Sequence, residues 1–178
     1  MRLFILVLSW LFSLPSLAQE YAVRYTYENR QYDSQERPED FQSLDSFSAG
    51  LRSGSFWYFL DYQTTQIESG NATLFVEQEH QALSLNPIME LQDNVFTEIY
   101  VIPYLGLIAG FHRDVVTTTL LGTPNTETGR WKGHLGALGG LRLKVPWVWA
   151  SVEARVLTSE SWAPSPALSV AALIGLTF

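Results

Sequence analysis

The stretch at residues 167–178, ALSVAALIGLTF, alternates apolar side chains with smaller and more mixed ones. Counting back from Phe178, the apolar set is Leu176, Ile174, Ala172, Val170 and Leu168. A period of two predicts a β-strand with one apolar face, because successive side chains of a strand point to opposite sides. Such a strand would promote aggregation in water, but it is stable where its apolar face meets lipid and both its edges are paired. A strand of a soluble sandwich is the alternative interpretation.

A terminal Phe178 preceded by alternating apolar residues resembles the closing strand of bacterial outer-membrane β-barrels. In that family, the resemblance implies, this strand is read by the barrel-assembly machinery. Phe178, Leu176 and Ile174 are therefore the expected assembly signal.

The first residues are typical of an export signal. Met1-Arg2 is positively charged, residues 3–12 (LFILVLSWLF) are apolar, and Ser16-Leu17-Ala18 is a small-x-small cleavage site. The apolar run is about half the roughly 20 residues that a membrane-spanning helix needs. We expect a cleaved signal peptide at 1–18 and a single barrel domain at 19–178, located in the outer membrane of a Gram-negative bacterium.

The composition fits an all-β membrane domain. The chain has no cysteine, so a disulfide-stapled secreted domain is disfavoured. Aromatic residues make up 13% and charged residues only 16% of the chain, yet after the first residues no apolar run is long enough for a helix. Apolar residues spread over alternating positions predict an eight-stranded antiparallel up-and-down transmembrane β-barrel, the smallest common kind.

The two-residue period predicts eight strands and their connections. The strands are expected at 21–31, 45–52, 56–63, 80–91, 95–112, 133–145, 148–156 and 167–178. Tight turns at 53–55, 92–94 and 146–147 alternate with longer loops at 32–44, 64–79, 113–132 and 158–166, with residues 72–76 as a candidate extension of a strand above the membrane. Short periplasmic turns and long external loops are typical of outer-membrane barrels. The architecture resembles the membrane domain of outer-membrane protein A and outer-membrane protein X.

The first strand shows a layout that is the inverse of a soluble protein. Tyr21, Val23, Tyr25 and Tyr27 share one face, whereas its other face carries arginine and glutamate. A lipid-facing exterior around a polar lumen satisfies both faces, so the sandwich interpretation becomes weaker. Two prolines disturb the pattern, because Pro87 and Pro103 each lack a ladder donor. A β-bulge or a loosely paired region between the fourth and fifth strands is expected there.

Inward-facing charges of both signs form the first candidate site. They are Arg24, Glu28, Arg30, Arg52, Asp61, Glu90, Glu98, Arg142, Lys144, Glu153 and Arg155. An eight-stranded barrel is about wide enough for its side chains to fill, and buried charges must be paired. We therefore predict an ion-pair network that plugs the lumen. A narrow or gated conduit is the alternative.

The histidines form the second candidate site. His80, His112 and His134 are expected near the outer rim, in polar surroundings. Asp114 follows His112 by two residues, so a hydrolase-like or metal-binding pair is conceivable, and some eight-stranded barrels are lipid A-modifying enzymes. The His-x-Ser-Asn pattern of a lipid A deacylase is absent, however. The sequence therefore predicts no enzyme and no catalytic, cofactor-binding or metal-ligating residues.

The expected partners follow from charge and location. The net charge is −7 and the predicted loops are acidic, which disfavours nucleic-acid binding. Outer-membrane lipids, lipopolysaccharide and the assembly machinery are the expected partners of a monomer. The predicted function is a non-enzymatic structural or surface-interaction role in the cell envelope. A lipid A-modifying enzyme and a narrow pore are the alternatives.

Overall fold

The computed structural model describes residues 20–31, 41–70, 74–91, 94–96, 99–159 and 167–178. The expected signal peptide at 1–18, most of the loops at 32–44 and 158–166, residues 92–93 of the second turn, and Glu98 lie outside these residues. The described residues form β1(Glu20–Gln31), β2(Phe41–Ser53), β3(Phe56–Gly70), β4(Leu74–Glu90), β5(Asn94–Phe96), β6(Ile99–Leu120), β7(Thr123–Thr128), β8(Lys132–Val145), β9(Val148–Ser159) and β10(Ala167–Thr177).

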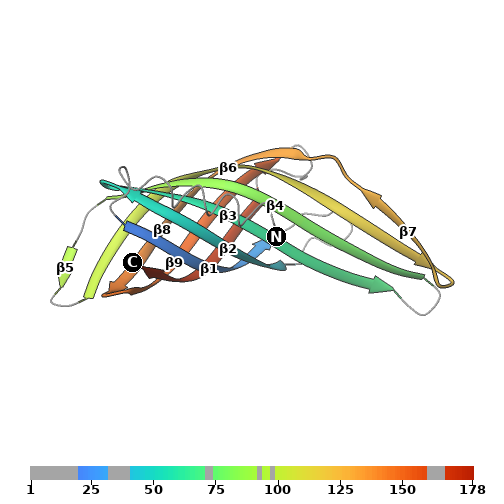
Figure 1. Cartoon of the computed structure of the whole chain (residues 1–178), viewed down its shortest axis with the longest axis horizontal. Coiled ribbons are helices and arrows are strands. Elements are labelled where there is room, and N and C mark those ends of the chain that lie inside the picture. Colours follow the sequence, from blue (N-terminus) through green and yellow to red (C-terminus); the bar gives the residue numbers. More distant parts are fainter. Residues whose placement is uncertain (1–19, 32–40, 71–73, 92–93, 97–98, 160–166) are drawn as a thin grey trace.

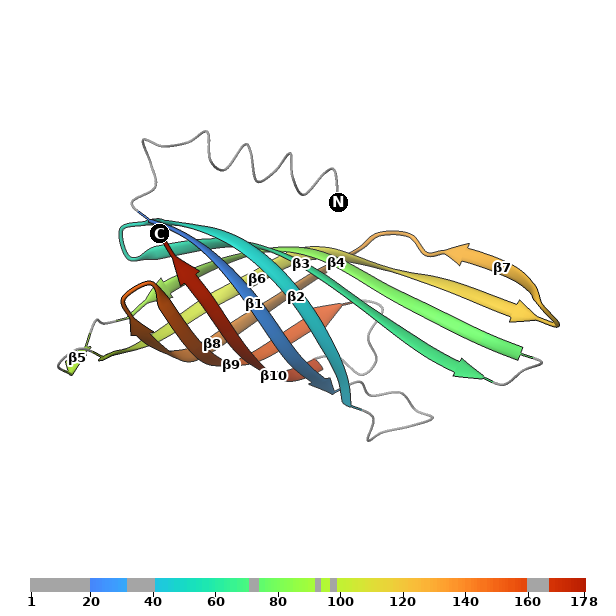
Figure 2. The same cartoon turned by 60° about the horizontal axis from the view of Figure 1, so that its bottom comes forward.

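Eight of these strands close into one antiparallel barrel (Figures 1 and 2). Neighbours pair in the order β1, β2, β3, β4, β6, β8, β9 and β10, and β10 pairs again with β1. Because each strand pairs with its successor along the barrel, the topology is up-and-down, as predicted. The short strands β5 and β7 lie outside this circle and pair only with β6.

The exposure of side chains alternates along the barrel strands as the period of two requires. In β10, Leu168, Val170 and Ile174 are 54–59% exposed, whereas Ala171 and Leu173 are buried. The same apolar exterior continues around the barrel in Phe47, Leu105, Leu107, Leu141, Leu143 and Val152. Within the described residues, no helix is long and apolar enough to span a membrane.

The predicted loops at 64–79 and 113–132 are wrong, because most of these residues continue the strands. β3 runs to Gly70, β4 begins at Leu74, and β6 runs to Leu120 before β7 folds back on it. Threonine and other β-branched residues are frequent here and favour extended backbone. Leu121 and Gly122 both have positive φ, which a two-residue hairpin turn requires. Figure 2 shows the resulting arm, defined as residues 65–70, 74–81 and 113–128, projecting from one end of the barrel.

The exterior of this wall becomes more polar where the arm begins. In the pairing of β4 with β6, Gln81 lies opposite Arg113 and Glu79 opposite Val115, on the side that continues the barrel exterior. The next level towards the barrel is Leu83 opposite Phe111, which is apolar. The apolar exterior of this wall therefore ends between these two levels.

Two other predicted boundaries are also wrong. The single strand expected at 95–112 is interrupted, because residues 94–96 form the separate strand β5, which pairs back on β6. β4 ends at Glu90 while β6 continues, so this part of the edge of β6 is open for β5 to cover. β2 begins at Phe41 rather than at residue 45, and its pairing with β1 runs to the end of that strand.

The two prolines cause no β-bulge. β4 pairs with β6 in the same register on both sides of Pro87, from Leu85 opposite Ala109 to Ile88 opposite Gly106. Only the two positions between these pairs lack ladder partners, so the expected loose pairing is found. Pro103 accepts a hydrogen bond from the Leu91 amide at 2.9 Å, just beyond the end of β4. The missing N–H of Pro103 points to the same edge of β6 as this carbonyl, where β4 has already ended. The missing donor therefore interrupts no ladder.

Candidate functional site

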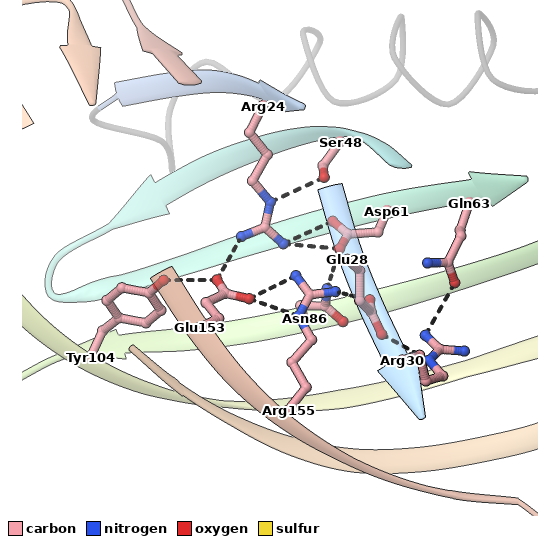
Figure 3. Close-up of polar contacts among 10 residues, drawn as sticks. All are labelled: Arg24, Glu28, Arg30, Ser48, Asp61, Gln63, Asn86, Tyr104, Glu153 and Arg155. Carbon is pink, nitrogen blue, oxygen red and sulfur yellow. Dashed lines mark hydrogen bonds and ion pairs between the residues drawn. The ribbon is translucent and has the colours of Figure 1, made fainter. Parts of the chain in front are cut away.

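The barrel interior holds a cluster of charged side chains that spans the lumen (Figure 3). We define the central cluster as Arg24, Glu28, Arg30, Asp61, Glu153 and Arg155, which are all buried. Three arginines face three carboxylates, so the cluster is formally neutral. Because these residues come from β1, β3 and β9, their contacts join strands that are not neighbours in the barrel.

Arg24, on β1, contacts side chains of three other strands at the centre of this cluster. Its guanidinium donates to both carboxylate oxygens of Asp61, at 3.0 and 2.9 Å, and to Ser48 Oγ at 3.0 Å. The Glu153 carboxylate lies 3.5 Å from it. Both contacts with Asp61 come from the same nitrogen, Nη2, and the charges on both groups make them stronger than hydrogen bonds between neutral groups. The Asn86 amide also donates to Asp61, at 2.5 Å.

Arg155 forms the second bridge of the central cluster. It contacts Glu153 on its own strand at 2.7 and 2.8 Å, and Glu28 on β1 at 2.8 Å. Arg30 contacts the other oxygen of Glu28 at 2.8 Å. The Tyr104 hydroxyl donates to Glu153 at 2.9 Å. Every charge of the cluster therefore has at least one opposite charge in contact, as buried charges require.

A second group lies nearer the tight turns and is partly open to solvent. Glu90 accepts from Arg142 at 2.7 Å and from the Trp57 indole at 3.0 Å, and its other oxygen lies 3.1 Å from Arg52. Arg52 and Lys144 each lie 3.4 Å from the same oxygen of Glu20. We call this group the turn-side cluster: Glu20, Arg52, Glu90, Arg142 and Lys144.

Aromatic rings separate the two clusters. Trp57 stacks on Phe59 at 5.4 Å, and Phe59 meets Trp149 edge-on at 6.2 Å. The Arg24 guanidinium lies 4.0 Å from the centre of the Phe59 ring. The Arg142 guanidinium lies 4.4 Å from the centre of the Trp149 ring, and the face of an aromatic ring attracts a cation. This contact stabilises Arg142 although two of its guanidinium nitrogens, Nε and Nη2, lack hydrogen-bond acceptors.

The structure brings together ten of the eleven charges that the sequence analysis singled out, and each makes an ion pair. Glu98 lies outside the described residues. Glu20 was not among the predicted charges, because it precedes the predicted first strand. It also left out the neutral partners Ser48, Asn86 and Tyr104. Their alternating positions predict that these three side chains point into the lumen. Their partners could not be predicted in the same way, because they lie on other strands.

A small cavity lies above the central cluster, towards the arm. Its volume is about 20 Å³, and Arg30, Asp61, Asn86, His134 and Arg155 contribute to its wall. A polar cavity of this size holds about one water molecule.

The three histidines lie beyond this cavity, on neighbouring strands. Their ring centres are 5.6 Å apart for His80 and His112 and 5.5 Å apart for His112 and His134. The interpretation of these histidines as residues of polar loops is wrong, because all three are buried on β4, β6 and β8, although they lie at the expected end of the barrel. Asp114 pairs with His80 at 2.8 Å rather than with His112, its neighbour in sequence. The cause is the register, which sets Asp114 opposite His80.

Asp114 lies at the level of the polar arm, above the apolar exterior. The hydrogen bond from His80 holds the pKa of the Asp114 carboxyl below its ordinary value. As the side chains stand, no three His, Asp or Glu residues in the described ranges surround a single point as metal ligands would.

The expected assembly signal lies where the barrel closes. The amides of Tyr21 and Phe178 each donate to the other's carbonyl at 2.9 Å, and their rings stack with centres 6.4 Å apart. Leu176 and Ile174 are 51% and 55% exposed on the same outer face. Its role as a signal stays a prediction.

No protein-family model matches the chain, and no curated protein sequence matches it. Several solved structures match the fold of the chain. Neisserial surface protein A is 15% identical with a TM-score of 0.63, over 89% of this chain and 96% of that one. The N-terminal β-barrel domain of Pseudomonas aeruginosa OprF is 13% identical with a TM-score of 0.54, over 90% and 98%.

The attachment invasion locus protein of Yersinia pestis, Ail, also matches. In its complex with the heparin analogue sucrose octasulfate it is 10% identical, with a TM-score of 0.53, over 89% of this chain and 97% of that one. At such low identities the likeness shows the fold alone. The chain therefore has the eight-stranded barrel fold of bacterial outer-membrane proteins.

Proposed function

We propose that this protein is a non-enzymatic outer-membrane barrel with a charge-plugged lumen and a structural or surface-interaction role in the cell envelope. The observation that carries the proposal is the buried central cluster inside an apolar exterior. A water-soluble protein would place these two surfaces the other way round, whereas lipid outside and paired charges inside satisfy both.

The location is part of the proposal. The chain is exported with a cleaved signal peptide at 1–18, is inserted by the barrel-assembly machinery and stays monomeric among outer-membrane lipids and lipopolysaccharide. Support comes from the export-like first residues and from the apolar belt. Fractionation of cells and the mass of the purified protein test it. Recovery from the inner membrane, or a mass that includes residues 1–18, would contradict it.

The plugged lumen rests on contacts across the barrel. Arg24 and Arg155 bind carboxylates on strands that are not their neighbours, while Phe59 and Trp149 pack in the lumen beside them. The small cavity beside Arg30, Asp61 and His134 has room for about one water molecule and no hydrated ion. In planar bilayers we expect no large, stable single channels from the purified barrel. Regular channels with a constant conductance would support the narrow pore instead.

The surface-interaction role rests on the arm. It carries Glu77, Glu79, Asp114 and Glu127 in its described part. This charge disfavours a sulfated polyanion of the kind seen in the Ail complex. Crosslinking from a cysteine introduced at exposed Thr126 in intact cells tests the role. A reproducible envelope or host partner supports it, whereas the same products from a cysteine at Trp147, in a tight turn of the opposite end, would indicate non-specific crosslinking.

One observation favours a second candidate, a lipid A-modifying enzyme. The His80–Asp114 pair at 2.8 Å has the spacing of a general base with its orienting carboxylate. Mass spectrometry of lipid A from cells with and without the protein separates the two. An altered acyl pattern that disappears in His80→Gln would support the enzyme, and an unchanged pattern the proposed role.

A further inference from the structure

The only three histidines of the chain meet at one place. His80, His112 and His134 are far apart in sequence, yet β4, β6 and β8 bring their rings together at the arm end of the lumen. Their exposed fractions are 5%, 1% and 6%, so this is a buried cluster rather than a solvated surface. Imidazole is the commonest metal ligand among protein side chains.

Two of the rings already have the spacing of metal ligands. The Nδ1 atoms of His112 and His134 are 3.3 Å apart. Zinc binds imidazole nitrogen at about 2.0–2.1 Å in tetrahedral geometry, which sets neighbouring ligand nitrogens about 3.3 Å apart. A hydrogen bond between two neutral rings has a similar length, so an experiment must separate the two possibilities.

His80 has the arrangement of a third ligand. Its Nδ1 is held by the Asp114 carboxylate at 2.8 Å. Its Nε2 is buried and has no hydrogen-bond partner. Histidine ligands commonly donate one ring nitrogen to a carboxylate while the other binds the metal. The Asp114 side chain is 39% exposed, so it has the freedom to follow the ring when His80 turns towards the other two.

We propose that His80, His112 and His134 form a binding site for a divalent transition metal of the zinc, copper or nickel class, with Asp114 as a positioning residue. Three imidazole nitrogens suit these metals rather than calcium or magnesium, which prefer oxygen. Asp114 and Lys132 lie opposite His80 and His112 in the strand registers, and Arg30 lines the same small cavity as His134. The site is independent of the proposed surface role.

Refolded full-length barrel in detergent is titrated with cobalt chloride, a spectroscopic probe of zinc sites, and with zinc chloride as competitor. We expect one metal ion per chain and the intense visible bands of four-coordinate cobalt, quenched by zinc. His112→Asn and His134→Asn should each weaken binding at least tenfold. Asp114→Asn keeps all three imidazoles and should weaken it by about 10- to 100-fold. Arg130→Gln, an exposed charge change near the mouth, is the matched control.

A gel-mobility shift on heating verifies that each variant is folded. X-ray absorption of the zinc-loaded wild-type protein needs no variant and should show imidazole ligands at the distances above. Weak six-coordinate cobalt bands, an X-ray spectrum without imidazole, or wild-type affinity in His112→Asn and His134→Asn would each overturn the proposal. In that case the 3.3 Å contact is a hydrogen bond between neutral rings.

Discussion

Replacing Arg24 by methionine tests whether the lumen is dry and held by charge pairing. The substitution keeps most of the chain length but removes both contacts with Asp61, the 3.5 Å contact with Glu153 and the hydrogen bond to Ser48. The Asp61 carboxylate then keeps only the hydrogen bond from the Asn86 amide, and water cannot replace the lost contacts because its side chain is only 4% exposed. Leaving such a carboxylate buried without a counter-charge costs about 3–5 kcal/mol of unfolding free energy.

The assay is reversible urea unfolding of the refolded barrel, followed by tryptophan fluorescence because Trp57 and Trp149 lie in the lumen. Arg130→Met makes the same change at an exposed position and should alter the unfolding free energy by less than about 0.5 kcal/mol. Adding Asp61→Asn to Arg24→Met removes the orphaned charge while keeping an oxygen for Asn86. The double variant should be about 2 kcal/mol more stable than Arg24→Met, so the two substitutions should be non-additive, as those of residues in contact are.

A loss of less than about 1 kcal/mol in Arg24→Met would refute this reasoning. That value is typical of solvent-exposed ion pairs, so it would mean that water fills the lumen and screens the cluster. Strict additivity of the Arg24 and Asp61 substitutions would refute it as well.

Three further outcomes are expected. Deleting Phe178 removes two hydrogen bonds that close the barrel and the stacking on Tyr21, so less heat-modifiable barrel should reach the membrane. Leu121→Ser at the arm tip is the control. Normal amounts of folded barrel without Phe178 would contradict the assembly signal. Gly110→Ala would set a Cβ 2.3 Å from the Leu83 carbonyl oxygen and should lower the free energy of urea unfolding by about 1–3 kcal/mol. Gly133→Ala is the control, because its Cβ would meet nothing within 4 Å. Equal losses of unfolding free energy in the two variants would contradict the strand packing. The pKa of Asp114 is lowered, so its bond with His80 stabilises the fold at neutral pH and loses that effect as the pH falls below the ordinary value of 3.8 and through the folded pKa. Asp114→Asn should therefore flatten the acid side of the plot of unfolding free energy against pH. An unchanged plot would contradict the pairing.

Much of the fold was predictable because strand periodicity is a local property. The alternation in residues 167–178 and around Arg24 and Glu28 indicated which side chains face out and which face in. Two tight turns were also predictable, at Gly54 and at Pro146-Trp147, because small and turn-forming residues separate apolar runs there. The arm was missed because polar alternation in water is weaker evidence for a strand than apolar alternation against lipid. The strand at 94–96 was missed because its pairing depends on the open edge of β6.

The sequence by itself determined an apolar exterior, a charged interior and eight strands to carry them, since these follow from residue types at a period of two. Only the tertiary structure decided which charges meet. Asp114 binds His80 rather than nearby His112, and Arg24 binds Asp61 two strands away, because strand register brings residues distant in sequence to the same level. Register depends on every strand of a closed barrel at once. The gathering of the three histidines has the same origin.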